Sequence, residues 1–192
     1  LAVALRDSQP MAGAMPLELQ SRGIQDAPSI RAAEVIEGER LRVRAVDGTG
    51  AARFDAFLDG SQLTLIARWQ GAVPIVHGTV AAVIRRRHDR RLTTWSAPLV
   101  RRALYAPVAL LPATVTEALR GTGLDLVDTL ALRDPASGHP FALQEIAYQA
   151  VLAQRERAEQ ELAGRWCAAE RGMLYIDGGV AGAADVARAA NV

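Results

Sequence analysis

The hydrophobic period of the sequence changes partway along the chain, and this change limits the folds that it can adopt. From residue 41 to about residue 104, apolar and polar residues alternate, which is typical of half-buried strands joined by turns. From about residue 144 to residue 168, apolar residues recur at helical spacing. A strand at 173–176 and a helix at 181–190 should follow. The sequence therefore predicts an α/β fold whose mixed sheet has antiparallel hairpin strands, followed by helix, strand and helix.

The regions around this core have weaker patterns. Residues 1–40 have helical spacing interrupted by prolines, and predict a segment of two short N-terminal helices. Residues 41–192 should form one domain with a connecting insertion at about 107–140, where Pro, Gly and Asp surround short helical pieces such as 114–120. Within the alternating region the predicted strands are 41–46, 54–58, 63–69, 74–85 and 92–95.

Composition restricts the class of protein. The 192 residues are 50% hydrophobic with a net charge of +1, as in a soluble globular chain of one or two domains. No apolar stretch is long enough to span a bilayer and no export signal is visible, so we expect a cytoplasmic protein. A single cysteine, Cys167, argues against a disulfide scaffold and a zinc site. Because the chain begins with Leu1 and stops at Val192 after an alanine-rich stretch, we expect a C-terminally truncated protein.

Two Asp-Gly pairs each follow the apolar start of a predicted strand. We expect Asp59 and Asp177 to end these strands, where a carboxylate would be desolvated unless a cation meets it. The Asp-Gly at 47–48 differs because Thr49-Gly50 follows it between two strands, which indicates a turn. The first two pairs therefore predict a shared cation site.

A glutamate in the predicted long helix is the candidate third acid. Glu159 shares a helical stripe with Leu152 and Trp166, so it should lie in the apolar face of the helix and face the two aspartates rather than solvent. The alternative is that Glu159 only forms a salt bridge with Arg155, one turn earlier. The remaining glutamates near it are expected to be solvated and paired with arginines: Glu156 and Glu161.

Three acids at one end of a sheet would form an oxygen-rich pocket, which suits magnesium or manganese better than zinc. Two such ions, ~4 Å apart, can activate a water and stabilise the leaving oxygen of a phosphodiester. This is the layout of nucleases with the RNase H-like fold.

Three stretches resemble the NurA family of nucleases: FDAFLDGSQ at 54–62, RERAEQEL at 155–162 and LYIDGG at 174–179. The resemblance runs from about residue 54 to the end of the chain. It implies an RNase H-like, Mn²⁺-dependent (or Mg²⁺-dependent) deoxyribonuclease that trims DNA ends in repair, as a homodimer, with a HerA-type hexameric ATPase. It makes Asp59 the first-strand ligand, Glu159 the helix ligand and Asp177 the fourth-strand ligand. The family normally adds a fifth strand and a further ligand, often a histidine, beyond the point where this chain stops.

An arginine-rich run lies at 85–91, and all 22 basic residues of the chain are arginine. Guanidinium groups bind phosphates bidentately, so this run predicts sequence-independent, salt-dependent contact with DNA. The alternative is a solvated hairpin end. The candidate DNA-binding residues are Arg85, Arg86, Arg87, Arg90 and Arg91.

Two other functions fit the sequence. A phosphotransferase of the actin and sugar-kinase type would need glycine-rich loops after both strands, for which Gly178, Gly179 and Gly182 are candidates. A non-catalytic module that binds nucleic acid or a protein partner would use the acids only to cap turns.

Overall fold

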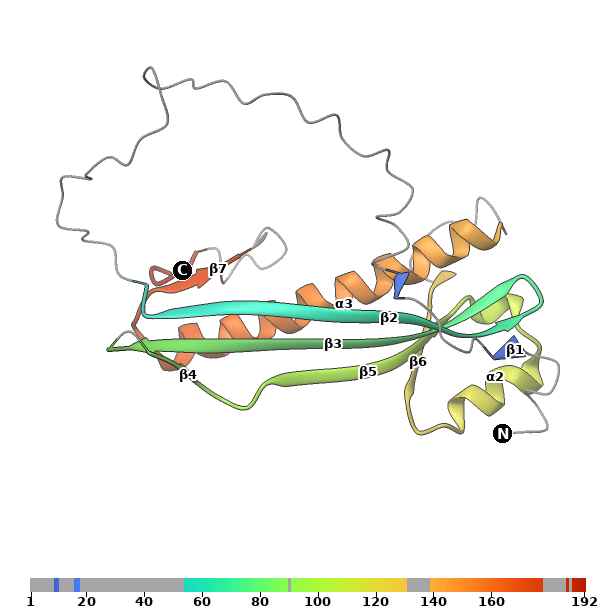
Figure 1. Cartoon of the computed structure of the whole chain (residues 1–192), viewed down its shortest axis with the longest axis horizontal. Coiled ribbons are helices and arrows are strands. Elements are labelled where there is room, and N and C mark those ends of the chain that lie inside the picture. The colour runs from blue at the N-terminus through green and yellow to red at the C-terminus, as the bar shows by residue number, and fades with distance from the viewer. Residues whose placement is uncertain are drawn as a thin grey trace, which may run out of the picture.

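The computed structural model describes residues 9–10, 16–17, 54–89, 91–130, 139–177, 186 and 188–192. Within them the chain forms one mixed sheet with a long helix along one face (Figure 1), so the predicted mixed α/β fold is confirmed at this level. The elements in chain order are β1 (Gln9–Pro10), β2 (Ala56–Gln70), β3 (Val73–His88), β4 (Arg91–Thr94), β5 (Leu99–Ala106), η1 (Val108–Leu110), α2 (Ala113–Arg120), β6 (Asp125–Asp128), α3 (Pro140–Ala169) and β7 (Leu174–Ile176).

A long hairpin of β2 and β3 forms the centre of the sheet. Its two strands are joined at Gly71, whose positive φ of 57° is accessible to glycine at little cost. The described strands follow the order β1-β2-β3-β5-β6, with β4 also paired to β3 and β7 to β2. β5 is antiparallel to β3, whereas β7 is parallel to β2 and β6 is parallel to β5.

The helix α3 covers one face of this sheet. Toward its C-terminal end Trp166 and Leu162 pack on Leu58 and Ile84, and Val151 packs on β3 farther back along the helix. Alternation along a strand assigns Leu58 and Gly60 to this helix-covered face. Asp59, between them, and its alternate neighbours Phe57 and Ser61 point to the opposite face, which we call the open face. Near β6, α2 packs against part of the open face through Val115 and Leu119.

The strands differ from the prediction in extent. Residues 54–58 and 63–69 were expected to be separate strands, but β2 is continuous through Asp59 and Gly60 because both pair with β3, opposite Val83 and Ala82. The expectation that the first strand ends at Asp59 is therefore wrong. β5 continues the sheet where no separate strand was predicted, and β6 is a sheet strand inside the segment read as an insertion.

The helical predictions can be compared only in part. α3 and β7 lie where the sequence predicted a helix and a strand, and α2 matches the helical piece at 114–120. Residues 41–53 lie outside the described residues, as do most of 1–40 and 181–190. Within the segment expected to be helical, Gln9–Pro10 instead pair as a strand with Arg68 and Trp69. None of the helices in the described part of the chain is long and apolar enough to cross a membrane.

Candidate functional site

Asp59 lies on β2, and Asp177 directly follows β7, the strand that pairs with β2. In the parallel pairing of β2 with β7, Phe57 is opposite Tyr175 and Leu58 is opposite Ile176. The pairing ends there, and a continuation of the register by one residue would bring Asp59 opposite Asp177, the first residue after β7. The expectation that Asp59 is desolvated is wrong, because both aspartates are exposed. Both therefore offer carboxylate oxygens to the solvent, and strand alternation places Asp59 on the open face.

Glu159 approaches the same place from the other side of the sheet. A Cβ atom built at Gly60 would lie 2.8 Å from the carboxyl carbon of Glu159 and still closer to its Oε1. The Glu159 carboxylate therefore occupies the space that any side chain at position 60 would need. Glycine at this position lets a helix residue reach the backbone beside Asp59.

The surroundings of Glu159 affect its charge. The side chain is only 14% exposed, and its Oε1 accepts a hydrogen bond from Arg155 Nη1 at 3.1 Å. Burial raises the pKa of Glu159; the charge of Arg155 acts against this shift and that of Asp59 adds to it. The salt bridge foreseen as the alternative role of Glu159 is thus present, and Glu159 is also within electrostatic range of Asp59.

Arg155 links the helix to the strand at this point. Its Nη1 lies 3.5 Å from the carbonyl oxygen of Gly60, while its Nε is buried without a hydrogen-bond partner in the described part of the chain. Of the two glutamates expected to be solvated and paired with arginines, Glu161 pairs with Arg101 of β5 and with Arg165, and its side chain is half-buried. Glu156 is exposed.

The chemistry of these oxygens suits a hard divalent cation, and the missing Cβ of Gly60 provides room for one of the donors. Within the described residues, however, no group of three histidine, cysteine or carboxylate side chains is close enough to hold a metal ion. Asp59 and Glu159 are coupled electrostatically, and Asp177 is adjacent to Asp59 in register only. The three acids share one region without forming a ligand set in this arrangement.

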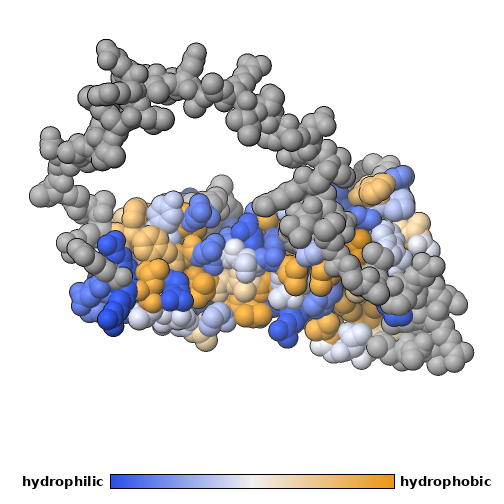
Figure 2. All heavy atoms as spheres, viewed as in Figure 1, coloured by the Kyte–Doolittle hydropathy of each residue, from blue (hydrophilic) through white to orange (hydrophobic). Residues whose placement is uncertain are grey.

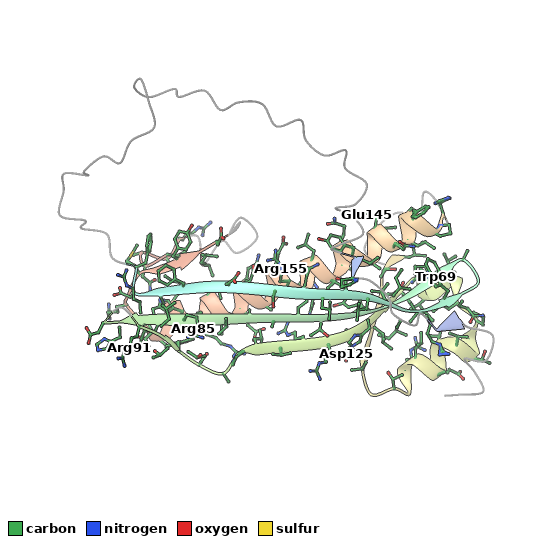
Figure 3. The ribbon with its side chains drawn as sticks, in the orientation of Figure 1. Trp69, Arg85, Arg91, Asp125, Glu145 and Arg155 are labelled. Atoms are coloured by element: carbon green, nitrogen blue, oxygen red, sulfur yellow. The ribbon has the colours of Figure 1, made fainter. Side chains whose placement is uncertain are left out.

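The arginines of the run at 85–91 differ in their contacts. Arg86 faces α3, where it pairs with Glu170 and lies 5.3 Å from the ring centroid of Trp166. Arg85 points to the open face and donates to the carbonyl oxygen of Leu92 at 2.8 Å. Arg87 and Arg91 are exposed, and Figure 3 places Arg85 and Arg91 at the β4 end of the sheet. Arg90 lies outside the described residues.

Sequence reasoning missed three aromatic residues beside the aspartates. The rings of Phe54 and Tyr175 meet edge to face with centroids 5.0 Å apart, and Phe57 lies 6.0 Å from Tyr175 and 6.4 Å from Phe54. Period-two alternation could have indicated that Phe57 shares a face with Asp59, and Tyr175 with Asp177. Figure 2 shows hydrophobic and strongly hydrophilic residues next to one another at this end of the molecule.

Comparisons with protein-family models, with curated proteins and with solved structures gave no match.

Proposed function

We propose that this chain is a metal-dependent deoxyribonuclease with an RNase H-like arrangement, of the kind that the resemblance to NurA nucleases implies. The observation that carries the proposal is that the carboxylate of Glu159 lies against Gly60, next to Asp59, while Asp177 directly follows β7, the strand that pairs with β2. The strand order supports it, because three antiparallel strands, β2, β3 and β5, are followed by α3 and by β7 parallel to the first. That is the order in which such a fold presents acids from its first strand, first helix and fourth strand.

The three acids have the same role in this proposal, although Glu159 reaches β2 from the helix-covered face and Asp59 lies on the open face. Asp59, Asp177 and Glu159 would hold Mn²⁺ or Mg²⁺, which when bound supplies a lowered pKa for the attacking water and charge stabilisation for the leaving oxygen. Asp59 and Asp177 are exposed, so DNA can reach both carboxylates. Arg155 holds Glu159 close to the strand, at the place where Gly60 leaves room for its carboxylate.

The partners and the setting belong to the same proposal. DNA is the substrate, a HerA-type hexameric ATPase and a second copy of the chain are the protein partners, and DNA-end repair in the cytoplasm is the setting. The phosphotransferase alternative gains no support at its first loop, because residues 59–61 are continuous strand. Its second loop, at 178–182, lies outside the described residues.

The test is hydrolysis of end-labelled linear DNA with Mn²⁺ or Mg²⁺. Asp59→Asn, Glu159→Gln and Asp177→Asn should each lower the rate at least roughly a hundredfold, because even outer-shell partners of metal ligands cost 10–100-fold when replaced. Glu156→Gln is the matched control, since Glu156 is an exposed carboxylate on the same helix. Equal rates in Glu159→Gln and Glu156→Gln would remove Glu159 from the site.

A further inference from the structure

An exposed group of aromatic rings lies directly beside the candidate carboxylates. Phe54, Phe57 and Tyr175, which we call the aromatic trio, pack on one another, yet Phe54 is 37% exposed and Tyr175 is 42% exposed. None of the three belongs to a buried core cluster of the described residues. Their rings contact each other and still present surface to solvent.

A second aromatic pair at this end of the molecule, Trp95 and Trp166, has a structural role and can be compared with the trio. Trp95 and Trp166 also meet edge to face, with centroids 5.2 Å apart. Trp166 is fully buried and donates its indole N–H to the carbonyl oxygen of Gly172, and Trp95 donates to Glu170. Those rings complete the core, whereas the aromatic trio lies on the opposite face of the sheet.

The trio lies between opposite charges. Phe57 is two residues before Asp59 on β2, so their Cα atoms are separated by about 6.6 Å along the strand, and Tyr175 is two residues before Asp177 in sequence. Across the hairpin, Arg85 is the direct partner of Phe57, and Arg87 donates its backbone N–H to Asp55. Both arginine side chains belong to the open face.

The geometry points to a stacking platform for the bases of an unpaired DNA strand. A base lying on the trio would have its phosphates near Arg85 and Arg87, and the next phosphodiester would extend toward Asp59. Stacking on aromatic rings together with arginine–phosphate contacts is the general way in which proteins bind single strands. A base paired inside a duplex has no free face to offer, so the platform selects unpaired ends. This inference rests on the proposed nuclease, whose substrate it specifies.

The charges favour this occupant over a protein. A docking site for a second copy or another protein through these rings would have to cover Arg85 and Arg87, and a desolvated charge is costly unless it is paired. A nucleic acid supplies a phosphate for each arginine along with the base. Binding of a second protein copy through these rings is therefore an alternative result, which the experiment below can detect.

The experiment measures binding without cleavage. A short single strand with 2-aminopurine at its end is titrated with the chain in EDTA, and stacking is read as quenching of the 2-aminopurine emission. In Phe54→Leu/Tyr175→Leu, the affinity should fall about tenfold or more and the quenching should disappear. Tyr175→Phe keeps the ring and should bind like the wild type. Val100→Ala, which shortens an exposed residue in the β5 strand of the same sheet, is the matched control.

Each outcome decides the matter. The platform would be overturned if Phe54→Leu/Tyr175→Leu quenched the emission as strongly as the wild type does. It would also be overturned if this variant lost as much affinity for a blunt duplex of the same sequence as for the single strand. The platform is also wrong if the double variant changes only self-association, measured by sedimentation.

The test separates this inference from the proposed nuclease function, because the Asp59→Asn variant should still quench the 2-aminopurine emission. If quenching depends on the rings but the chain hydrolyses no DNA with either metal, the proposed nuclease function is wrong and the platform stands. If hydrolysis is intact but binding does not depend on the rings, the platform is wrong and the nuclease proposal stands.

Discussion

Gly60 is the position where the absence of a side chain matters most for the candidate site. The carboxylate of Glu159 fills the volume that a Cβ atom of residue 60 would occupy, and Arg155 approaches the carbonyl oxygen of Gly60. Glycine is thus required here by a close approach, since β2 is regular strand at this point. The position of Glu159 beside β2 therefore depends on the absence of a side chain at residue 60.

Gly60→Ala should move Glu159 away from the strand. The clash involves the end of a flexible side chain, so the loss of stability should be roughly 1–3 kcal/mol, with a larger relative loss of nuclease activity. Melting curves and DNA hydrolysis measure the two effects. Gly164→Ala is the control, because a Cβ there meets nothing within 4 Å and alanine should stabilise the helix by up to about 1 kcal/mol. Full activity in Gly60→Ala would show that Glu159 need not lie over the strand.

The pKa of Glu159 gives a pH prediction. Burial raises this pKa, so the folded chain binds the proton more tightly than the unfolded chain does. The contribution of Glu159 to stability is therefore greatest at low pH and declines as the pH rises through the raised pKa. Glu159→Gln lacks this dependence. Its melting temperature relative to the wild type should rise between about pH 4 and pH 7, and a constant difference would contradict the raised pKa.

At the scale of elements, the C-terminal end of α3 holds the candidate site together. Trp166 is fully buried there, between Arg86, Trp95 and the backbone of Gly172 just before β7. Because Gly172 lies in the short connection from α3 to β7, the indole fixes how β7 enters the sheet. The position of Asp177 therefore depends on a residue that never touches it.

Trp166→Ala should destabilise the chain by about 3–5 kcal/mol, as expected for removal of a large buried ring. The measurement is chemical denaturation. Phe141→Ala, on the first turn of the same helix, is the control because Phe141 is 71% exposed, and its effect should stay within about 0.5 kcal/mol. Similar losses in the two variants would mean that Trp166 does not anchor β7.

The elements that the sequence predicted best are α3, whose helical pattern is long and regular, and the short strand β7 that follows it. α3 and β7 were found because helical spacing persists over many turns and a short apolar run follows it. The continuity of β2 was missed because Asp59-Gly60 is a turn signal locally, and only pairing with β3 makes it strand. The aromatic trio was missed because Phe57 and Tyr175 are far apart in sequence and meet only through the parallel pairing.

For the whole molecule, charge is distributed unevenly even though the net charge is only +1. Exposed arginines gather at the β4 end, whereas Arg155 lies farther along α3 and is occupied by Glu159 (Figure 3). Arg86, proposed from the sequence as a DNA contact, has its guanidinium between Glu170 and Trp166. DNA contact through this run is therefore expected mainly from the exposed members.

Arg87→Gln and Arg91→Gln should weaken DNA binding similarly for all sequences. Each lost phosphate contact should also reduce the slope of log K against log[salt] by about 1. Fluorescence anisotropy at several salt concentrations gives both quantities. Arg120→Gln, at the end of α2 and exposed, is the matched control. Unchanged slopes in the Arg87 and Arg91 variants would assign these residues to a solvated hairpin end.

The parallel pairing of β2 with β7 also sets the order in which the chain folds. β2 and β3 are neighbours in sequence and can zip together from Gly71, whereas Asp55 and Met173, which join the two parallel strands, are 118 positions apart. Closing so long a loop is entropically costly, so β7 should dock late and detach early. Amide hydrogens of β7 should therefore exchange with solvent sooner than those at the middle of the hairpin. Asp177, the residue that follows β7, would then come beside β2 only at the final stage of folding.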